Sequence, residues 1–230
     1  MNWKDTYKMN KIIWGQYDAA DYPLKHFFYN EIPENIKGIL IKMCERKLAV
    51  FRGGIAFIFL LSKTDYQLKD LDMLATIDNR DAIIDVLSES DIVYVNKNSF
   101  RDTVITAFWK DGYEFFKLDV LLNSELPRLT RIVFESNTIY TVSASYIWRN
   151  RIEKIAEKEK RCHDEEKTRN HYSVAMAISN YLKENSNEIF DEDVGIVEKR
   201  LSEAETVLMD IVSENEVNKF VTLQKEILRR

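Results

Sequence analysis

The stretch Phe51-Arg52-Gly53-Gly54 decides the fold of this chain, together with Lys69-Asp70-Leu71-Asp72 and Leu118-Asp119-Val120 further along. A glycine pair at the end of an apolar run lets the backbone approach a phosphate, because no Cβ stands in the way. Alternate residues of a strand point to the same face, so Asp70 and Asp72 direct their carboxylates to one side. Asp119, between apolar neighbours, is expected on a later strand, where it can complete the cluster.

The composition is that of an ordinary globular protein: 230 residues, 45% of them apolar and 31% charged. The net charge of −5 gives no general attraction to nucleic acid, so such a partner would need a local basic patch. Cys44 and Cys162 are two isolated thiols, which is typical of a reducing compartment. The longest apolar run, residues 55–61, is too short to cross a bilayer. We therefore expect a cytoplasmic protein with no membrane partner.

Residues 1–143 are expected to form a mixed β-sheet flanked by helices. Residues 1–30 are rich in aromatic side chains and predict short helices that pack on this body. Hairpin turns are predicted at residues 110–112 and 135–137. The periodicity predicts strands over 48–51, 71–75, 92–95, 103–109, 113–121, 131–134 and 138–142, and helices from Pro33 onward, over 55–61 and over 80–87.

The strand signal ends near Ser143. Either Ser143 or Ser145 is placed to cap a long helix, and residues 172–182 and 196–228 predict further amphipathic helices with a break at 213–215. Strands first and helices afterwards indicate the α+β class. We expect an α/β domain over residues 1–143 and a helical domain over 144–230.

Three converging carboxylates beside a glycine pair are typical of a site for divalent metal and triphosphate. Mg²⁺ prefers oxygen ligands, and two ions about 3.5–4 Å apart can hold the attacking and leaving oxygens of a phosphoryl group. Asp70 and Asp72 are expected to bind both ions, and Asp119 the ion that activates the hydroxyl. Lys117 shares the strand face of Asp119, so it could reach a phosphate or balance the carboxylates.

Each motif alone also has an ordinary structural explanation. Asp-x-Asp occurs by chance in acidic sequences, and Gly-Gly usually marks a tight turn. Three carboxylates on buried strands, however, need cations to offset their desolvation, which favours metal binding. The glycine pair lacks the lysine and hydroxyl of a P-loop, and this excludes an ordinary P-loop NTPase.

The combined pattern resembles the polymerase-beta-type nucleotidyltransferase superfamily, whose hallmark is Gly-Gly or Gly-Ser, then Asp-x-Asp and a distant third acid. Within it, Phe51-Arg52-Gly53-Gly54-Ile55-Ala56 is similar to the Phe-Lys-Gly-Gly-Thr-x-Leu opening of the AbiEii-like toxin nucleotidyltransferases. The resemblance implies transfer of a nucleoside monophosphate from an NTP to a hydroxyl acceptor, with Mg²⁺ as cofactor. It makes Asp70, Asp72 and Asp119 the catalytic metal ligands, and Arg52, Gly53, Gly54 and Lys117 part of the nucleotide site.

The AbiEii-like resemblance extends to about residue 182. Arg151 stands where that family has a lysine, and Arg169-Asn170-His171-Tyr172-Ser173 stands where it has Arg-Asp-x-Tyr-Asp. This adds Arg151 and Lys154 to the expected nucleotide-binding residues. With Lys158 and Arg161 they form a basic stripe on one helical face, which supports RNA, particularly a tRNA end, as acceptor. The other interpretation of the stripe is a solvated face paired with neighbouring glutamates.

Several alternatives stay open. The toxin resemblance also implies a cognate antitoxin as partner, and the same metal core serves transfer to a small molecule or a protein. A hypothesis of another class is a non-catalytic module that binds nucleotide or nucleic acid. The changes at Asn170 and Ser173 favour the module, whereas the three intact aspartates favour an enzyme.

Overall fold

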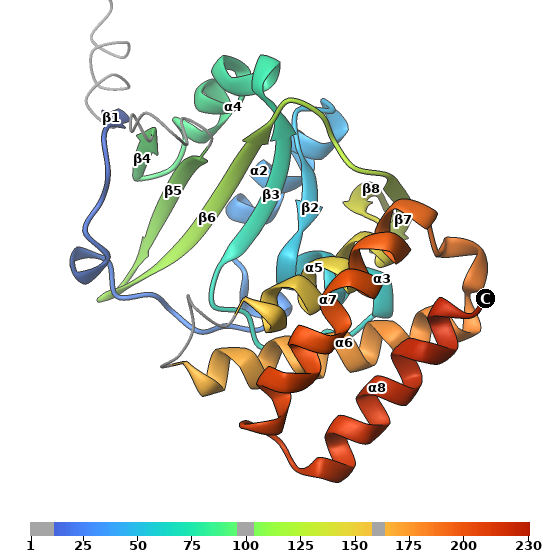
Figure 1. Cartoon of the computed structure of the whole chain (residues 1–230). Helices are drawn as coiled ribbons and strands as arrows, with labels where there is room; N and C mark the ends of the chain where they lie inside the picture. Colours follow the sequence, from blue (N-terminus) through green and yellow to red (C-terminus); the bar gives the residue numbers. More distant parts are fainter. Residues whose placement is uncertain (1–11, 96–103, 158–163) are drawn as a thin grey trace, which may run out of the picture. The chain divides into compact units, whose positions relative to one another are not determined.

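The computed structural model describes residues 12–95, 104–157 and 164–230, and the chain divides into two compact units, Met1–Val142 and Ser143–Arg230 (Figure 1). The first unit is built on one mixed sheet with helices, and the second on helices alone. The expected α+β class, a mixed sheet followed by C-terminal helices, is confirmed.

The sheet has eight strands in the order β1-β4-β5-β6-β3-β2-β8-β7. In chain order they are β1 (Ile12–Trp14), β2 (Val50–Arg52), β3 (Leu71–Thr76), β4 (Ile92–Val95), β5 (Val104–Asp111), β6 (Glu114–Asn123), β7 (Leu129–Phe134) and β8 (Asn137–Val142). The pairs β1–β4, β2–β8 and β3–β6 are parallel, and the remaining pairs are antiparallel. Figure 1 shows β3 and β6 side by side in the middle of the sheet.

Helices α2 (Glu34–Glu45), α3 (Gly53–Leu61) and α4 (Arg80–Leu87) complete the first unit. All three occur where the periodicity predicts a helix, and α3 begins at the glycine pair itself. Because side chains alternate along each strand, the pairing forms a row of apolar side chains across the core face, with one member from each of β2, β3, β6, β5 and β4. These side chains are at most 1% exposed: Phe51, Met73, Val120, Ile105 and Val95.

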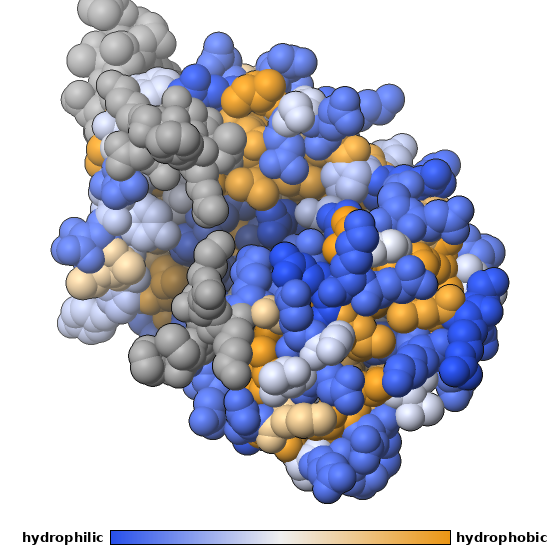
Figure 2. All heavy atoms as spheres, in the orientation of Figure 1, coloured by the Kyte–Doolittle hydropathy of each residue, from blue (hydrophilic) through white to orange (hydrophobic). Residues whose placement is uncertain are grey.

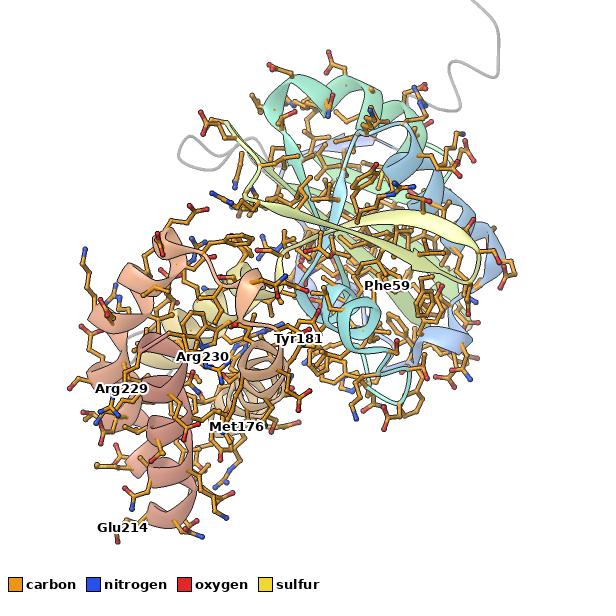
Figure 3. The ribbon with its side chains drawn as sticks, turned by 90° about the vertical axis from the view of Figure 1, so that its right-hand side faces the viewer. Phe59, Met176, Tyr181, Glu214, Arg229 and Arg230 are labelled. Atoms are coloured by element: carbon orange, nitrogen blue, oxygen red, sulfur yellow. The ribbon has the colours of Figure 1, made fainter. Side chains whose placement is uncertain are left out.

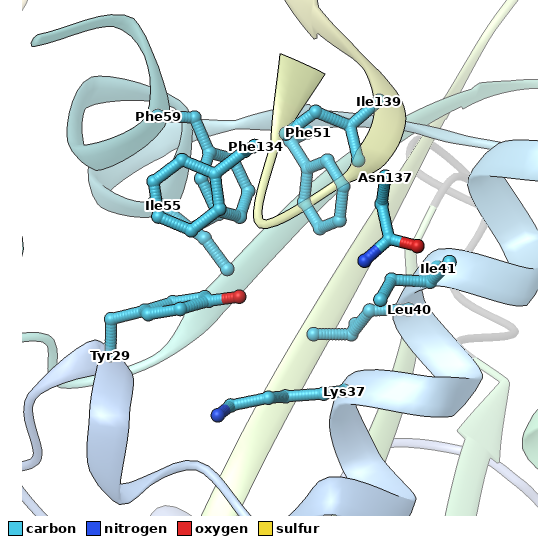
Figure 4. A pocket seen from close by; sticks show the side chains of 10 residues that line it. All are labelled: Tyr29, Lys37, Leu40, Ile41, Phe51, Ile55, Phe59, Phe134, Asn137 and Ile139. Atoms are coloured by element: carbon cyan, nitrogen blue, oxygen red, sulfur yellow. The ribbon is translucent and has the colours of Figure 1, made fainter. Parts of the chain in front are cut away.

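Aromatic rings join α3 to the core face of β2 and to the β7–β8 hairpin. The ring centroids of Phe51 and Phe59 are 4.9 Å apart, and those of Phe59 and Phe134 are 4.7 Å apart. Figure 4 shows these rings with Tyr29 around a small hollow. The hollow has a volume of about 10 Å³, which is room for about one water molecule, so it is a packing defect of the core.

The N-terminal segment differs from its expected helices. Residues 12–14 form β1, an edge strand in which Ile13 lies opposite Tyr94 of β4, and the helical content is two 3₁₀ turns, Ala19–Asp21 and Tyr29–Glu31. A three-residue strand is too short to show periodicity, and its partner lies far along the chain. Residues 1–11 lie outside the described part of the chain, so the expectation there stays a prediction.

Both predicted hairpins are present, but their turns are shorter than expected. The β5–β6 turn is Gly112-Tyr113, and Gly112 has a φ of 63°. The β7–β8 turn is Glu135-Ser136, with φ values of 46° and 68°. A two-residue turn with a positive φ matches the twist of paired strands. At these turns β5 continues two residues beyond its predicted end, and β8 begins one residue before its predicted start.

The second unit consists of α5 (Ala144–Ala156), α6 (Glu165–Glu184), α7 (Asp191–Met209) and α8 (Glu214–Leu228). Ser143 rather than Ser145 caps α5, because its Oγ accepts a hydrogen bond of 3.1 Å from the Tyr146 amide. Ser213 caps α8 at the predicted break. Figure 3 shows Glu214 at one end of α8 and Arg229 at the other, an arrangement that suits the helix dipole.

The face of the second unit that Figure 2 shows is largely hydrophilic, with bands of apolar residues between the hydrophilic ones. The interior of this unit holds a polar group at its centre. The indole nitrogen of the fully buried Trp148 donates to Gln224 Oε1 at 2.7 Å, and the Ser179 hydroxyl donates to the same oxygen at 3.0 Å. Over the described ranges, no helix is both long enough and apolar enough to cross a membrane.

The Trp148–Gln224 bond provides a test of this unit. In Gln224→Leu the buried indole N–H loses its acceptor, and we expect a loss of about 1–3 kcal/mol in the free energy of unfolding. Urea denaturation followed by far-UV circular dichroism measures this loss. Gln67→Leu is the matched control, because Gln67 is exposed, and it should change stability by less than about 0.5 kcal/mol. Equal stability of the two variants would contradict a structural role for the bond.

Candidate functional site

One transverse row of side chains crosses the face of the sheet opposite the core. Pairing places Arg52 opposite Asp72, Asp72 opposite Asp119, Asp119 opposite Thr106, and Thr106 opposite Tyr94. Because paired residues on neighbouring strands share a face, these five side chains from β2, β3, β6, β5 and β4 form a continuous line. Predominantly polar groups in the middle of a sheet define this face as the candidate site.

Asp119 is held by donors on both of its oxygens. Thr106 Oγ1 donates to Oδ1 at 2.7 Å, and Lys117 Nζ lies 2.6 Å from Oδ2. The same ammonium is 3.9 Å from Asp70 Oδ2, so Lys117 lies within reach of two of the predicted carboxylates. Burial alone would lower the pKa of Lys117, but the charge of Asp119, its hydrogen bond and a bond with Tyr17 together raise that pKa. Lys117 is therefore protonated and supplies the positive charge beside Asp119 and Asp70.

The side chain of Asp72, on β3, lies against the backbone of Gly53, the first residue of α3. Gly53 has a φ of 65°, and a Cβ built on it would collide with the Asp72 carboxylate. Gly54 is also confined, because a Cβ there would come within 2.7 Å of Leu68 Cδ2. Gly53 thus lets the start of α3 lie against β3, and Gly54 lets it lie against the segment that precedes β3. The expected approach of a phosphate to these glycines stays a prediction.

Asp70 differs from the expectation in its local structure. β3 begins at Leu71, so Asp70 precedes the strand by one residue instead of lying on it with Asp72. Its side chain is 39% exposed, compared with 25% for Asp119. Asp70 therefore extends the cluster toward solvent, just before the first residue of β3.

The donor set suits Mg²⁺ in chemical type, because all three candidate ligands are carboxylates. Among the side chains that the structure describes, however, no three His, Cys, Asp or Glu residues are gathered so that they could hold a metal ion. Lys117 lies close to two of the carboxylates, and Asp72 lies against Gly53. Metal binding by Asp70, Asp72 and Asp119 would require Lys117 to move off Asp119, and it stays a prediction.

The two basic residues expected at the nucleotide lie on α5, in the second unit. Arg151 Nη1 is 2.7 Å from His171 Nδ1, and Lys154 Nζ is 3.1 Å from Glu157 Oε2. The pairing of Lys154 with a neighbouring glutamate matches the interpretation of the stripe as a solvated face. Lys158 and Arg161, the other members of the stripe, lie outside the described residues. A role for Arg151 and Lys154 in nucleotide binding stays a prediction.

The sequence reasoning did not select Thr106, Tyr94 or Tyr17. Thr106 is 4% exposed and bonds to Asp119, and Tyr17 contacts Lys117, whose ammonium is 5.7 Å from the Tyr17 ring centroid. A hydroxyl between apolar residues on a predicted strand is the signal that could have identified Thr106. No local signal marks Tyr94, because its place in the row depends on the pairing of β4 with β5.

The fold is similar to that of a solved protein. No family model matches the sequence, and no curated protein matches it. The crystal structure of an antigenic nucleotidyltransferase-like protein from Paracoccidioides brasiliensis superposes with a TM-score of 0.52 at 11% identity. The match covers 87% of this chain and 96% of the other. The chain therefore has a nucleotidyltransferase-like fold.

The contact between Gly53 and Asp72 can be measured with a matched pair of substitutions. Gly112 has nearly the same φ as Gly53, but nothing lies within 4 Å of its added Cβ. Gly112→Ala should therefore cost only the backbone strain, about 1–2 kcal/mol. Gly53→Ala should cost at least about 1 kcal/mol more, because Asp72 must also move. Chemical denaturation of both variants measures the difference, and equal losses would show that Asp72 does not need the glycine.

Proposed function

We propose that this protein is a Mg²⁺-dependent nucleotidyltransferase that moves a nucleoside monophosphate from an NTP to a hydroxyl acceptor. The observation that supports it most is the pairing of Asp72 with Asp119 across β3 and β6, beside a helix that begins at Gly53. The nucleotidyltransferase-like fold is the second support. Two carboxylates in register on neighbouring central strands repel each other unless a cation joins them.

The reaction exchanges one phosphorus–oxygen bond for another. The acceptor oxygen bonds to the α-phosphorus, the bond from the α-phosphorus to the pyrophosphate oxygen breaks, and the hydroxyl proton passes to a carboxylate of the cluster. Bound Mg²⁺ would lower the pKa of the hydroxyl and stabilise the charge on the leaving pyrophosphate. Asp70, Asp72 and Asp119 would be its ligands.

The chain also offers groups for the phosphates. The first amides of α3, at Gly53 and Gly54, have no partner within the helix and suit an anion. Arg52 lies in the same row as Asp72 and brings a permanent positive charge to this end. Lys117 would become available to a phosphate once it moved off Asp119. For Arg151 and Lys154 the support is the AbiEii-like resemblance alone.

The finer assignment is to the AbiEii-like toxin group, with RNA, particularly a tRNA end, as acceptor and a cognate antitoxin as partner. The sequence from Phe51 to Ala56 supports this assignment, and so does the basic stripe that begins at Arg151. Ser173, where that group has an aspartate, donates its hydroxyl to the Arg169 carbonyl one turn earlier in α6. It supplies no carboxylate, so any activity rests on the sheet residues.

Transfer can be tested with each of the four α-labelled NTPs, Mg²⁺ and total cellular RNA. We expect label in one class of acceptor, with release of pyrophosphate. Asp119→Asn should lower the rate by more than about 100-fold, since loss of even an outer-shell partner of a metal costs 10–100-fold. Asp81→Asn, at an exposed position of α4, is the control and should act as wild type. Labelling that survives in Asp119→Asn would contradict the proposal.

A non-catalytic nucleotide-binding module is the second candidate, because Lys117 already pairs with Asp119 and lies 3.9 Å from Asp70. Calorimetric titration with Mg²⁺ and each NTP separates the two functions. For the transferase, Asp70→Ala should weaken triphosphate binding by about tenfold or more, through loss of a metal ligand. Asp65→Ala, an exposed control, should leave the affinity unchanged. Triphosphate binding that is indifferent to Asp70→Ala would favour the module.

A further inference from the structure

A cavity of about 260 Å³ opens beside Asp119, on the side of the row away from Gly53. It lies within the first unit, between the end of β1 and strands β4, β5 and β6. Its lining consists of Gly15, Gln16, Tyr17, Tyr94, Val104, Thr106 and Asp119. Three of these, Tyr94, Thr106 and Asp119, are consecutive members of the transverse row. The cavity is therefore continuous with the candidate site.

The polar end of the cavity is fixed and still reachable. Asp119 is held by Thr106 on one oxygen and by Lys117 on the other, and a quarter of its side chain is exposed. The Thr106 bond orients the carboxylate whether or not Lys117 remains on the other oxygen, so little further ordering is needed when a ligand arrives. The carboxylate presents lone pairs to a hydroxyl that enters the cavity.

Two packed aromatic rings, Tyr17 and Tyr94, also line the cavity. The ring centroids of Tyr17 and Tyr94 are 5.6 Å apart, and Tyr17 also packs edge-on against Phe108 at 5.1 Å. The hydroxyls of Tyr94 and Tyr22 are 2.8 Å apart, which fixes the Tyr94 ring in place. Each ring is only partly buried, so part of its surface remains open to a ligand. Such surfaces bind flat rings by stacking, at about 1–3 kcal/mol for each nucleic-acid base.

Size and charge restrict what the cavity can take. Its volume lies just below the range of about 300–1,000 Å³ that is usual for drug-sized ligands, so it suits one ring system rather than an extended chain. None of the seven lining residues that the structure describes is cationic, which disfavours a triphosphate here. The glycines and Arg52, which suit phosphates, lie toward the other end of the row.

We propose that this cavity is the acceptor subsite, and that it takes one nucleoside whose base stacks on Tyr17 or Tyr94 with a ribose hydroxyl toward Asp119. The inference rests on the proposed function and adds to it the chemical class of the acceptor. The nucleoside can be free or can be the 3′ end of an RNA strand, because the cavity holds the same group in both cases. The ribose oxygen then attacks the α-phosphorus, and pyrophosphate leaves from the side of Gly53.

The chain provides a variant that adds a bulky side chain to the cavity lining with little risk to folding. Gly15 lines the cavity, and a Cβ added to it meets nothing within 4 Å, so Gly15→Leu occupies open space. Tyr94→Ala removes the stacking surface in a second way. Tyr113→Ala is the matched control for it, because Tyr113 is 95% exposed in the β5–β6 turn. Thermal melts show which variants remain folded, and Gly15→Leu decides the result if Tyr94→Ala unfolds.

The test uses ligand-observed NMR with adenosine, cytidine, guanosine and uridine in one arm and a short oligoribonucleotide in the other. We expect at least one nucleoside to bind, with affinity lowered about tenfold or more in Gly15→Leu and Tyr94→Ala and unchanged in Tyr113→Ala. A free-nucleoside acceptor binds in the first arm as tightly as in the second. An RNA acceptor binds more tightly in the second arm, with the same dependence on Gly15.

Two results would overturn the assignment. In one, no nucleoside or oligoribonucleotide binds, and in the other binding is as tight in Gly15→Leu as in wild type. Titration with Mg²⁺ and NTP is measured in parallel on the same proteins. If NTP binds and the cavity variants have no effect on nucleosides, only the subsite is wrong. If NTP does not bind wild type at all, the proposed function itself fails.

Discussion

The parallel register of β3 against β6 is the constraint on which the rest of the site depends. It runs over six residues, from Leu71 opposite Leu118 to Thr76 opposite Asn123, and it sets Asp72 opposite Asp119. Both strands bury an apolar side chain at every second position, so a slip of one residue would place Met73 in the polar row and a carboxylate in the core. The burial that stabilises the sheet therefore also fixes the geometry of the carboxylates.

The sequence predicted those features whose signals are local. Arg80–Leu87 and Ile92–Val95 occur at the predicted residues, and α3 begins at the glycine pair, because caps, turns and periodicity act within a few residues. The row as a whole could not be predicted, since it joins strands whose pairing depends on distant segments. Tyr94 enters the row only through β5, and β1 joins β4 across more than seventy positions of sequence.

Lys117 explains how the sheet tolerates its acidic residues. Asp119 alone would be costly to bury beside Asp72, but a lysine two residues earlier on the same strand face places an ammonium 2.6 Å from it. The same spacing in β3 and its preceding residue brings Asp70 to that ammonium. The alternation that directs the acids to one face therefore supplies their counter-ion as well. A divalent cation that bound the same carboxylates would compete with Lys117 for them, since both satisfy the same negative charge.

The two ends of the transverse row differ in charge and in chemical type. At the β2 end stand a permanent cation, Arg52, and the start of α3, and both attract anions. At the β4 end stand Tyr94, Tyr17 and a cavity whose described lining has no cation, and these favour a neutral, flat ring. The carboxylates lie between the two ends, where neither a phosphate nor an aromatic ring would be stable against them without a shared cation. A phosphate donor at one end and a ring-bearing acceptor at the other would therefore meet at Asp72 and Asp119. Bond exchange at phosphorus needs a cation at this position, to balance the negative charges of the phosphate and the carboxylates.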